Sequence, residues 1–274
     1  MKIKSVLALL KKELLNWQEF DMTVKELYEK LCERIPEDLR EDWDNDGLMC
    51  SSDVQKEVHR VLVTLDVTED IVDYAVSHNI DLILSHHPLI FRPLTSVTED
   101  SHVARKVIKL IKNDISVMSF HTRADKVEGG VNDILADILG IKNTVPFGEG
   151  FLGRIGTLDE ELSMEDFSYL LKGLLDCDGV KVADALIPVS KVAVVGGDGK
   201  SYVSAALRAG ADTFVSGRIG YNVMAEAGEM GINLIEAGHF FTEQPVTQFF
   251  QTLLHRLDSD MYVEIMDSNV IKLI

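Results

Sequence analysis

The chain has 274 residues, of which 46% are hydrophobic, and it carries a formal net charge of −18. A surface this acidic repels phosphate backbones, so broad nucleic-acid binding is not expected, and a phosphate-bearing substrate would need a local positive centre such as a metal ion. No apolar stretch approaches the roughly 20 residues that span a bilayer, so we expect no membrane association. The cysteines lie far apart without a CxxC pair, which favours a reducing cytoplasm. They are Cys32, Cys50 and Cys177.

Residues 1–21 are predicted to form an appended amphipathic helix. Their apolar run at 5–10 is short, and charged residues follow it directly at 11–13, which argues against a signal peptide. A second helix is predicted over 24–34, because Thr23 has the character of an N-cap and the apolar residues after it have helical spacing.

The middle of the first half alternates between strand and helix patterns. Strands are predicted at 61–65, 81–84 and 115–120, with helices between them at 69–77 and 102–112. Strands that alternate with helices favour a mostly parallel sheet with helices on its faces.

The second half repeats this order. Strands are predicted at 191–195, 212–216 and 232–237, with a helix at 201–209. Asp81 and Asp212 open the middle strand of each set at the same spacing from the first strand. The sequence therefore predicts an α/β fold with two intimately packed, duplicated lobes, 22–144 and 145–274, that direct equivalent strand ends at one cleft.

Histidines and carboxylates follow the apolar strand runs. They are His86, His87, His121 with Asp125 four residues later, and His239 with Glu243 four residues later. Taken alone, each motif is more often a strand end or a helix cap than a ligand set. Taken together, imidazoles and carboxylates from three strand ends suit Zn, Fe or Mn, and five such ligands make a pair of metals about 3.5–4 Å apart feasible.

The local geometry of two motifs leaves specific questions. Neighbouring strand residues point to opposite faces, so His86 and His87 serve either different metals or one metal only because Pro88 ends the strand. In GHFFTEQP, Thr242 is predicted to cap a helix that Glu243 opens.

Other chemical motifs fit less well. GGDGKS at 196–201 resembles a phosphate-binding loop, but Val194 stands where that motif requires glycine. A tight strand-to-helix turn is the better interpretation. The sequence contains no HxH, HExxH or GxSxG motif.

Five motifs occur along the chain in a fixed order. They are WDNDGL (43–48), LDVTED (65–70), LSHHPLIF (84–91), HTRAD followed by GGVND (121–133), and GHFFTEQP (238–245). Together they resemble the Nif-three-like family of dinuclear metal-centre proteins, whose members are often labelled homologs of type 2 GTP cyclohydrolase I. The resemblance extends from about Met22 to the C-terminus and corresponds to the short form of the family.

The resemblance implies a toroidal homohexamer with a two-metal site in each subunit. The implied metal ligands are His86, His87, Asp125, His239 and Glu243. Glu243 or Asp125 would bridge the two ions. His121 matches a histidine beside the site and is a candidate for proton transfer, so His121 and Glu243 are the predicted catalytic residues.

Two functions are compatible with these residues. In the first, two divalent ions (Zn, Fe or Mn) activate water against a nucleotide, as in GTP ring opening, or against a phosphoester. In the second, the protein is a non-catalytic metal-binding scaffold. Asn222 and Val223 slightly favour the second, because the family commonly has His and Asp there.

Overall fold

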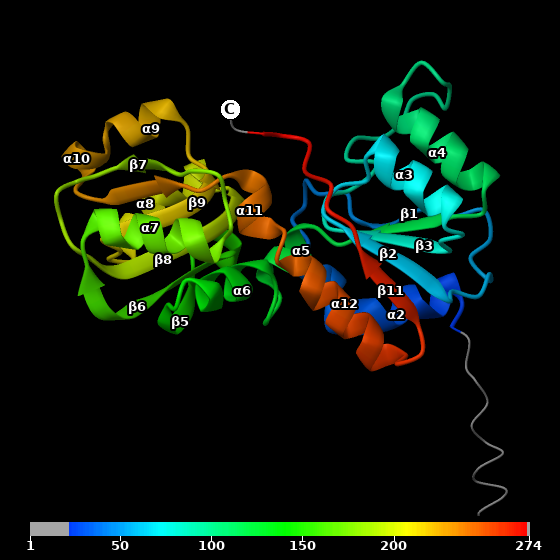
Figure 1. Ribbon diagram of the computed structural model, residues 1–274, viewed down its shortest axis with the longest axis horizontal. Coiled ribbons are helices and arrows are strands. Elements are labelled where there is room, and N and C mark those ends of the chain that lie inside the picture. Colours follow the sequence, from blue (N-terminus) through cyan, green and yellow to red (C-terminus); the bar gives the residue numbers. More distant parts are fainter. Residues whose placement is uncertain (1–21, 273–274) are drawn as a thin grey trace, which may run out of the picture.

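The computed structural model describes residues 22–272 and contains two β-sheets flanked by helices (Figure 1). The predicted α/β class with two lobes is confirmed. The predicted helix over 1–21 lies outside the described residues. Within the described part of the chain, none of the helices combines the length and the apolar character needed to cross a membrane.

The first sheet has five strands. In spatial order they are β1 (Gly47–Cys50), β4 (Ser116–Ser119), β3 (Leu82–Ser85), β2 (Arg60–Thr64) and β11 (Tyr262–Ile265). Strands β4, β3, β2 and β11 run parallel, and β1 pairs antiparallel with β4.

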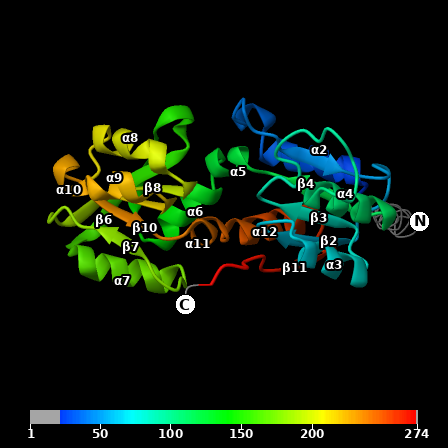
Figure 2. The same cartoon turned by 90° about the horizontal axis from the view of Figure 1, so that it is seen from above.

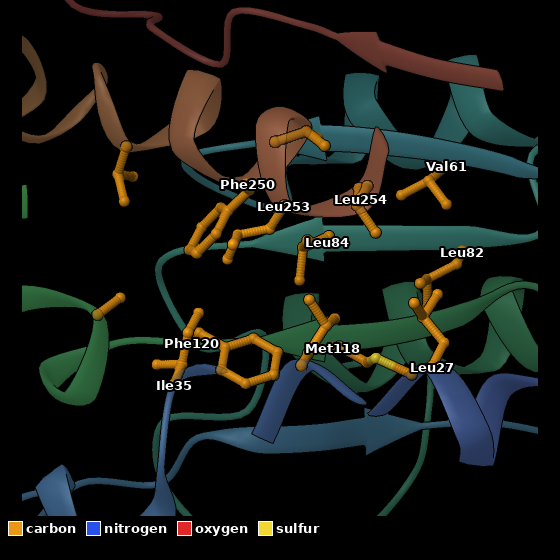
Figure 3. Close-up of a cluster of buried hydrophobic side chains, with 14 of the residues drawn as sticks. Leu27, Ile35, Val61, Leu82, Leu84, Met118, Phe120, Phe250, Leu253 and Leu254 are labelled. Atoms are coloured by element: carbon orange, nitrogen blue, oxygen red, sulfur yellow. The ribbon is translucent and has the colours of Figure 1, made fainter. Parts of the chain in front are cut away.

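Helices cover both faces of this sheet. They are α2 (Val24–Arg34) and α12 (Val246–Leu257) on one face, and α3 (Glu69–Ser77) and α4 (His102–Lys112) on the other. Figure 3 shows Phe250 and Leu254 of α12 packed with Leu84 and Met118 of the strands, and Leu27 of α2 in the same cluster. Burying these apolar side chains is the main force that holds the layers together.

The second sheet has six strands. In spatial order they are β5 (Lys142–Phe147), β6 (Gly153–Leu162), β8 (Val189–Asp198), β9 (Thr213–Arg218), β10 (Asn233–Glu236) and β7 (Lys181–Ala183). Strands β8, β9 and β10 run parallel, and the outer strands pair antiparallel.

Apart from α7 (Met164–Leu174), the helices of the second lobe are shorter than those of the first. Helices α6 (Val131–Ile138) and α7 pack on one face, and α8 (Val203–Arg208), α9 (Tyr221–Ala225) and α10 (Ala227–Met230) pack on the other. Two further helices, α5 (Thr122–Lys126) and α11 (His239–Glu243), lie between the lobes in both views (Figures 1 and 2). Single turns of 3-10 helix occur at Glu37–Leu39, Glu149–Phe151 and Lys200–Tyr202.

The two lobes repeat one local contact as well as one order of elements. The Asp81 carboxylate accepts hydrogen bonds from the backbone N–H groups of His59 and Arg60 at the start of β2. The Asp212 carboxylate accepts from Ser190 and Lys191 in β8. The equal spacing of these aspartates in the sequence therefore corresponds to equivalent positions in space.

The sheets divide the chain differently from the predicted lobes 22–144 and 145–274. Strand β5 begins at Lys142 and belongs to the second sheet, whereas β11 pairs with β2 in the first. The reason is packing: α6 contributes to the apolar core of the second lobe, and α12 contributes to that of the first. An amphipathic pattern identifies a buried face but does not say which sheet covers it.

Candidate metal centre

The predicted site residues come together between the lobes. His86 and His87 follow β3, His121 and Asp125 lie at the start and in the body of α5, and His239 and Glu243 are the first and last residues of α11. Helix α11 packs against β8 and β9 of the second sheet, while α5 packs into the core of the first lobe. The strand ends of both lobes therefore face one centre, as the sequence predicts.

Glu243 is the central side chain of this cluster. Its Oε2 lies 2.9 Å from Nε2 of His239 and 3.0 Å from Nε2 of His87. Its Oε1 lies 3.8 Å from Nε2 of His86. The two oxygens of one carboxylate thus face different sets of imidazoles.

His86 and His87 approach Glu243 from one strand end. Their backbone N–H groups still donate to Thr64 and Leu65, so the parallel pairing continues past β3, and their rings lie 5.0 Å apart. Each reaches a different oxygen of the carboxylate. The two adjacent imidazoles therefore face different oxygens of one carboxylate, although both also belong to one possible ligand set with His121.

Two buried atoms in the cluster have no hydrogen-bond partner among the described residues. They are Nε2 of His86 and Oδ1 of Asp125, which lie 3.5 Å from each other. His86 is fully buried and Asp125 is 8% exposed. Because an unsatisfied buried polar atom is costly, a cation held between these atoms fits the site.

Groups of donors that could hold an ion recur around the cluster. Three sets of ligand atoms each lie within 4.8 Å of one another: His86, Asp125 and Glu243; His87, His239 and Glu243; and His86, His87 and His121. All are nitrogen or oxygen donors, which suits divalent transition metals better than a thiolate site would. The chain therefore has a candidate metal centre at this position.

A second layer of hydrogen bonds orients the imidazoles. Nδ1 of His86 donates to the carbonyl of Phe120, at 2.9 Å. Nδ1 of His87 pairs with Asp66, and Nδ1 of His121 pairs with Asp44, each at 2.8 Å. Because Nδ1 is engaged in every case, Nε2 is the nitrogen left for the centre.

Electrostatics keep Glu243 ionised. Burial opposes its charge, but hydrogen bonds from His239 and His87, together with the nearby His86 imidazole, outweigh this and hold its pKa well below the usual range. Burial also disfavours charge on His87, yet hydrogen bonds to Asp66 and Glu243 raise its pKa to about 10. Without an ion, protons on the imidazoles therefore balance the carboxylate.

The glycines of GGDGKS make room for Glu243. A Cβ on Gly197 would lie 2.1 Å from Oε1 of Glu243, and the φ of Gly197 is +65°, so glycine satisfies both the space and the backbone there. The N–H of Gly197 donates to Oγ1 of Thr242, at 3.1 Å. The segment is thus the end of β8 and the 3-10 turn that leads into α8, which agrees with the predicted connection from strand to helix.

The predicted role of Thr242 is wrong. Helix α11 already begins at His239 after Gly238, whose φ is +90°, so Thr242 lies in the body of the helix. Its hydroxyl donates to the Gly238 carbonyl and accepts from Gly197 instead of capping a helix that starts at Glu243.

The sequence analysis assigned no role to Asp44 and Asp66. Asp66 directly follows the apolar run of β2, which is the same signal that identified the histidines. Asp44 lies in an irregular loop and reaches His121 only through the fold, so no spacing in the sequence indicates it. Asn222 and Val223, which depart from the family pattern, lie on α9 and do not line the cavity beside the centre.

Comparisons with known proteins identify relatives of this chain. A GTP cyclohydrolase 1 type 2 homolog of Clostridium perfringens is 37% identical over 234 residues, which cover 82% of this chain and 89% of the relative. One from Clostridium acetobutylicum is 30% identical over 261 residues, covering 91% and 97%.

Solved structures share the fold. A Bacillus cereus protein related to NIF3 superposes with a TM-score of 0.83 at 24% identity, covering 93% of this chain and 100% of that one. A Staphylococcus aureus hypothetical protein has the same TM-score at 27% identity, covering 92% and 99%. Residues 22–273 match the sequence pattern of one family. The chain therefore belongs to the Duf34/NIF3 (NGG1p interacting factor 3) family.

Proposed function

We propose that this protein is a hydrolase that uses two divalent metal ions, bridged by Glu243. The observation that carries the proposal is the division of donors around one carboxylate. His86, which lies 3.5 Å from Asp125, faces Oε1, whereas His87 and His239 face Oε2. A carboxylate with separate donor sets at its two oxygens is suited to join two ions.

The residues present define what the centre could do. Bound Zn, Fe or Mn ions would polarise a substrate oxygen and lower the pKa of a coordinated water. His121 would move a proton, because Asp44 fixes its Nδ1 and its ring lies 5.3 Å from that of His86 and 5.6 Å from that of His87. Hydrogen bonds to Asp44 raise the pKa of His121 against the opposing effect of burial, so the ring can hold that proton.

The class of substrate follows from the relatives. Their name, GTP cyclohydrolase 1 type 2 homolog, supports a nucleotide whose ring is opened, with a phosphoester as the other member of the class. We further propose the homohexamer and the cytoplasmic location that the sequence analysis expects.

The first experiment counts metal ions in purified variants by elemental analysis. We expect two ions per wild-type chain, a loss of about one in Asp125→Ala and of about one in His239→Ala, and a loss of both in Glu243→Ala. His102→Ala serves as the matched control, because His102 is exposed on α4 far from the centre. If His86→Ala combined with His239→Ala leaves the metal content unchanged, the proposed ligands are wrong.

The second experiment measures turnover. Metal-loaded protein is incubated with GTP and with a generic phosphodiester, and Glu243→Ala is the comparison. Metal-dependent hydrolysis that is lost in Glu243→Ala supports the hydrolase. Bound metal without hydrolysis of either compound would instead support the non-catalytic scaffold.

A further inference from the structure

A cavity of about 580 Å³ opens beside the candidate metal centre, and its wall combines aromatic with acidic side chains. Asp125, His239 and Glu243 form its floor, and the cavity reaches outward between the two lobes. Its outer part contains aromatic and acidic side chains rather than the basic side chains that bind phosphates.

Aromatic side chains stand uncovered at the rim. Trp43 is 62% exposed and Phe91 is 45% exposed, although both are large and apolar. Their rings lie 6.2 Å apart in an edge-on arrangement, and the His121 ring lies 6.1 Å from Trp43. Tyr202 adds a further ring from the second lobe. Exposed rings next to a cavity provide surfaces on which a flat ligand can stack.

The charged side chains in the outer wall of the cavity are acidic. Glu41, Glu149 and Asp198 line the outer part, and no lysine or arginine lines the cavity within the described part of the chain. Two of the nearby cations are already paired: Lys126 lies 2.6 Å from Glu41, and Arg218 lies 3.9 Å from Asp198.

This wall selects against long phosphate chains. Two divalent ions would more than neutralise the negative charges of Asp125 and Glu243 at the floor of the cavity. Glu149 and Asp198, however, lie at the exposed rim, where the phosphates of a triphosphate would meet their carboxylates. Like charges repel, whereas carboxylates and aromatic faces both attract a cationic ring.

We propose that the cavity binds a planar nitrogen-containing ring, neutral or cationic, and discriminates against polyphosphates such as a nucleoside triphosphate. The inference rests on the proposed function, because the ring would be the part of the substrate beside the metal centre. Within the hydrolase proposal, the substrate would then be a nucleoside or a free heterocycle in place of the triphosphate that the relatives' name suggests.

The test is equilibrium dialysis with three probes at fixed ionic strength. They are 7-methylguanosine, which carries a cationic ring, guanosine, which is neutral, and GTP. We expect 7-methylguanosine to bind most tightly and GTP to bind at least about tenfold more weakly than guanosine in chelator-treated protein, where no ion adds attraction for phosphate. GTP binding as tightly as guanosine in chelator-treated protein would overturn the proposal.

Substitutions in the cavity wall test whether its side chains bind the ring. Trp43→Leu is expected to weaken both nucleosides about tenfold through loss of stacking. Tyr169→Leu is the matched control, since Tyr169 is equally exposed but lies on α7 outside the cavity. The double variant Glu149→Gln with Asp198→Asn is expected to tighten GTP binding roughly two- to fivefold. Unchanged nucleoside binding in Trp43→Leu would overturn the proposal.

The two proposals fail in different ways. Dialysis of chelator-treated protein needs no turnover, so nucleoside binding without hydrolysis contradicts the hydrolase and leaves the ring-binding cavity intact. Hydrolysis of GTP with no preference for nucleosides contradicts the ring-binding cavity and leaves the hydrolase intact.

Discussion

At the scale of single residues, the hydrogen bonds of the Nδ1 atoms, which point away from the candidate metal centre, orient the imidazoles that would bind an ion. The Phe120 carbonyl and the carboxylates of Asp66 and Asp44 each hold one Nδ1 atom. Asp66 is itself fixed from the other end of the described chain, because Ser268 donates to its Oδ2 at 3.2 Å. Such partners fix both the ring orientation and the tautomer of a ligand histidine.

Asp66→Ala is expected to weaken metal binding by about 10- to 100-fold, because His87 loses the partner of its Nδ1 atom. Competition with a chromogenic chelator measures this affinity. Asp70→Ala, an exposed carboxylate on α3, is the control and should bind metal as the wild type does. An equal affinity in Asp66→Ala would show that Asp66 does not position His87.

Arg123 makes a second prediction at this scale, one of stability. Its side chain is fully buried, its Nε donates to Asp46 at 3.0 Å, and its Nη1 donates to the Ile35 carbonyl. Arg123→Met removes the closest cation from the buried Asp46 carboxylate and leaves Arg40 at 3.7 Å, which is expected to cost about 3 kcal/mol of unfolding free energy.

Chemical denaturation measures the effect of Arg123→Met. Arg105→Met is the matched control, because Arg105 pairs with Glu69 at the surface and its loss should cost less than about 1 kcal/mol. A loss in Arg123→Met no larger than that of the control would contradict this account.

At the scale of elements, Glu236 at the end of β10 holds the turn that follows β9. Its carboxylate accepts from the N–H groups of Ile219 and Gly220, at 2.8 and 2.9 Å, and pairs with Lys181. Burial disfavours the charge, but these hydrogen bonds outweigh it and lower the pKa of Glu236 below its usual range.

The lowered pKa fixes the sign of a pH effect. A carboxyl group whose folded pKa is depressed stabilises the protein above its unfolded pKa, and this contribution is lost as the pH falls through the folded value. Glu236→Gln should therefore be about 1 kcal/mol less stable at pH 7 and lose less stability than the wild type below about pH 4.5. Urea unfolding in chelator at several pH values measures this, and parallel pH profiles would contradict it.

Elements were also what the sequence predicted best. The strands that lead to His86, His121 and His239 are short segments with apolar centres, and each observed end lies within one residue of the predicted one. The start of α11 was not predicted correctly, because Gly238 accepts a positive φ and lets the helix begin three residues before Thr242. Partners such as Asp44 depend on contacts between loops distant in sequence, which no local pattern encodes.

At the scale of the whole molecule, the candidate metal centre joins the two lobes. His86, His87 and Asp125 belong to the first lobe, whereas His239 and Glu243 lie on a helix that packs on the second sheet. An ion held by both sets would link the lobes directly, and binding to the folded state alone stabilises that state.

Removal of metal is therefore expected to lower the Tm. At a free ion concentration of a thousand times Kd, binding contributes about 4 kcal/mol. At about 2–4 °C per kcal/mol for a domain of this size, the Tm should fall by roughly 10 °C on treatment with a chelator. Scanning calorimetry measures the shift, and Glu243→Ala should show almost none. A shift of equal size in Glu243→Ala would place the stabilising ion elsewhere.

The return of α12 and β11 to the first sheet has a consequence for synthesis. The second lobe is built from one continuous stretch, 131–243, whereas the first needs both 22–127 and 246–272. A chain leaving the ribosome can therefore complete the second sheet while the apolar strand β2 still lacks β11 as its neighbour. Until residues 262–265 have been synthesised, β2 is an open edge with which other nascent chains can pair. A chaperone that binds nascent chains would therefore be needed most at this stage of synthesis.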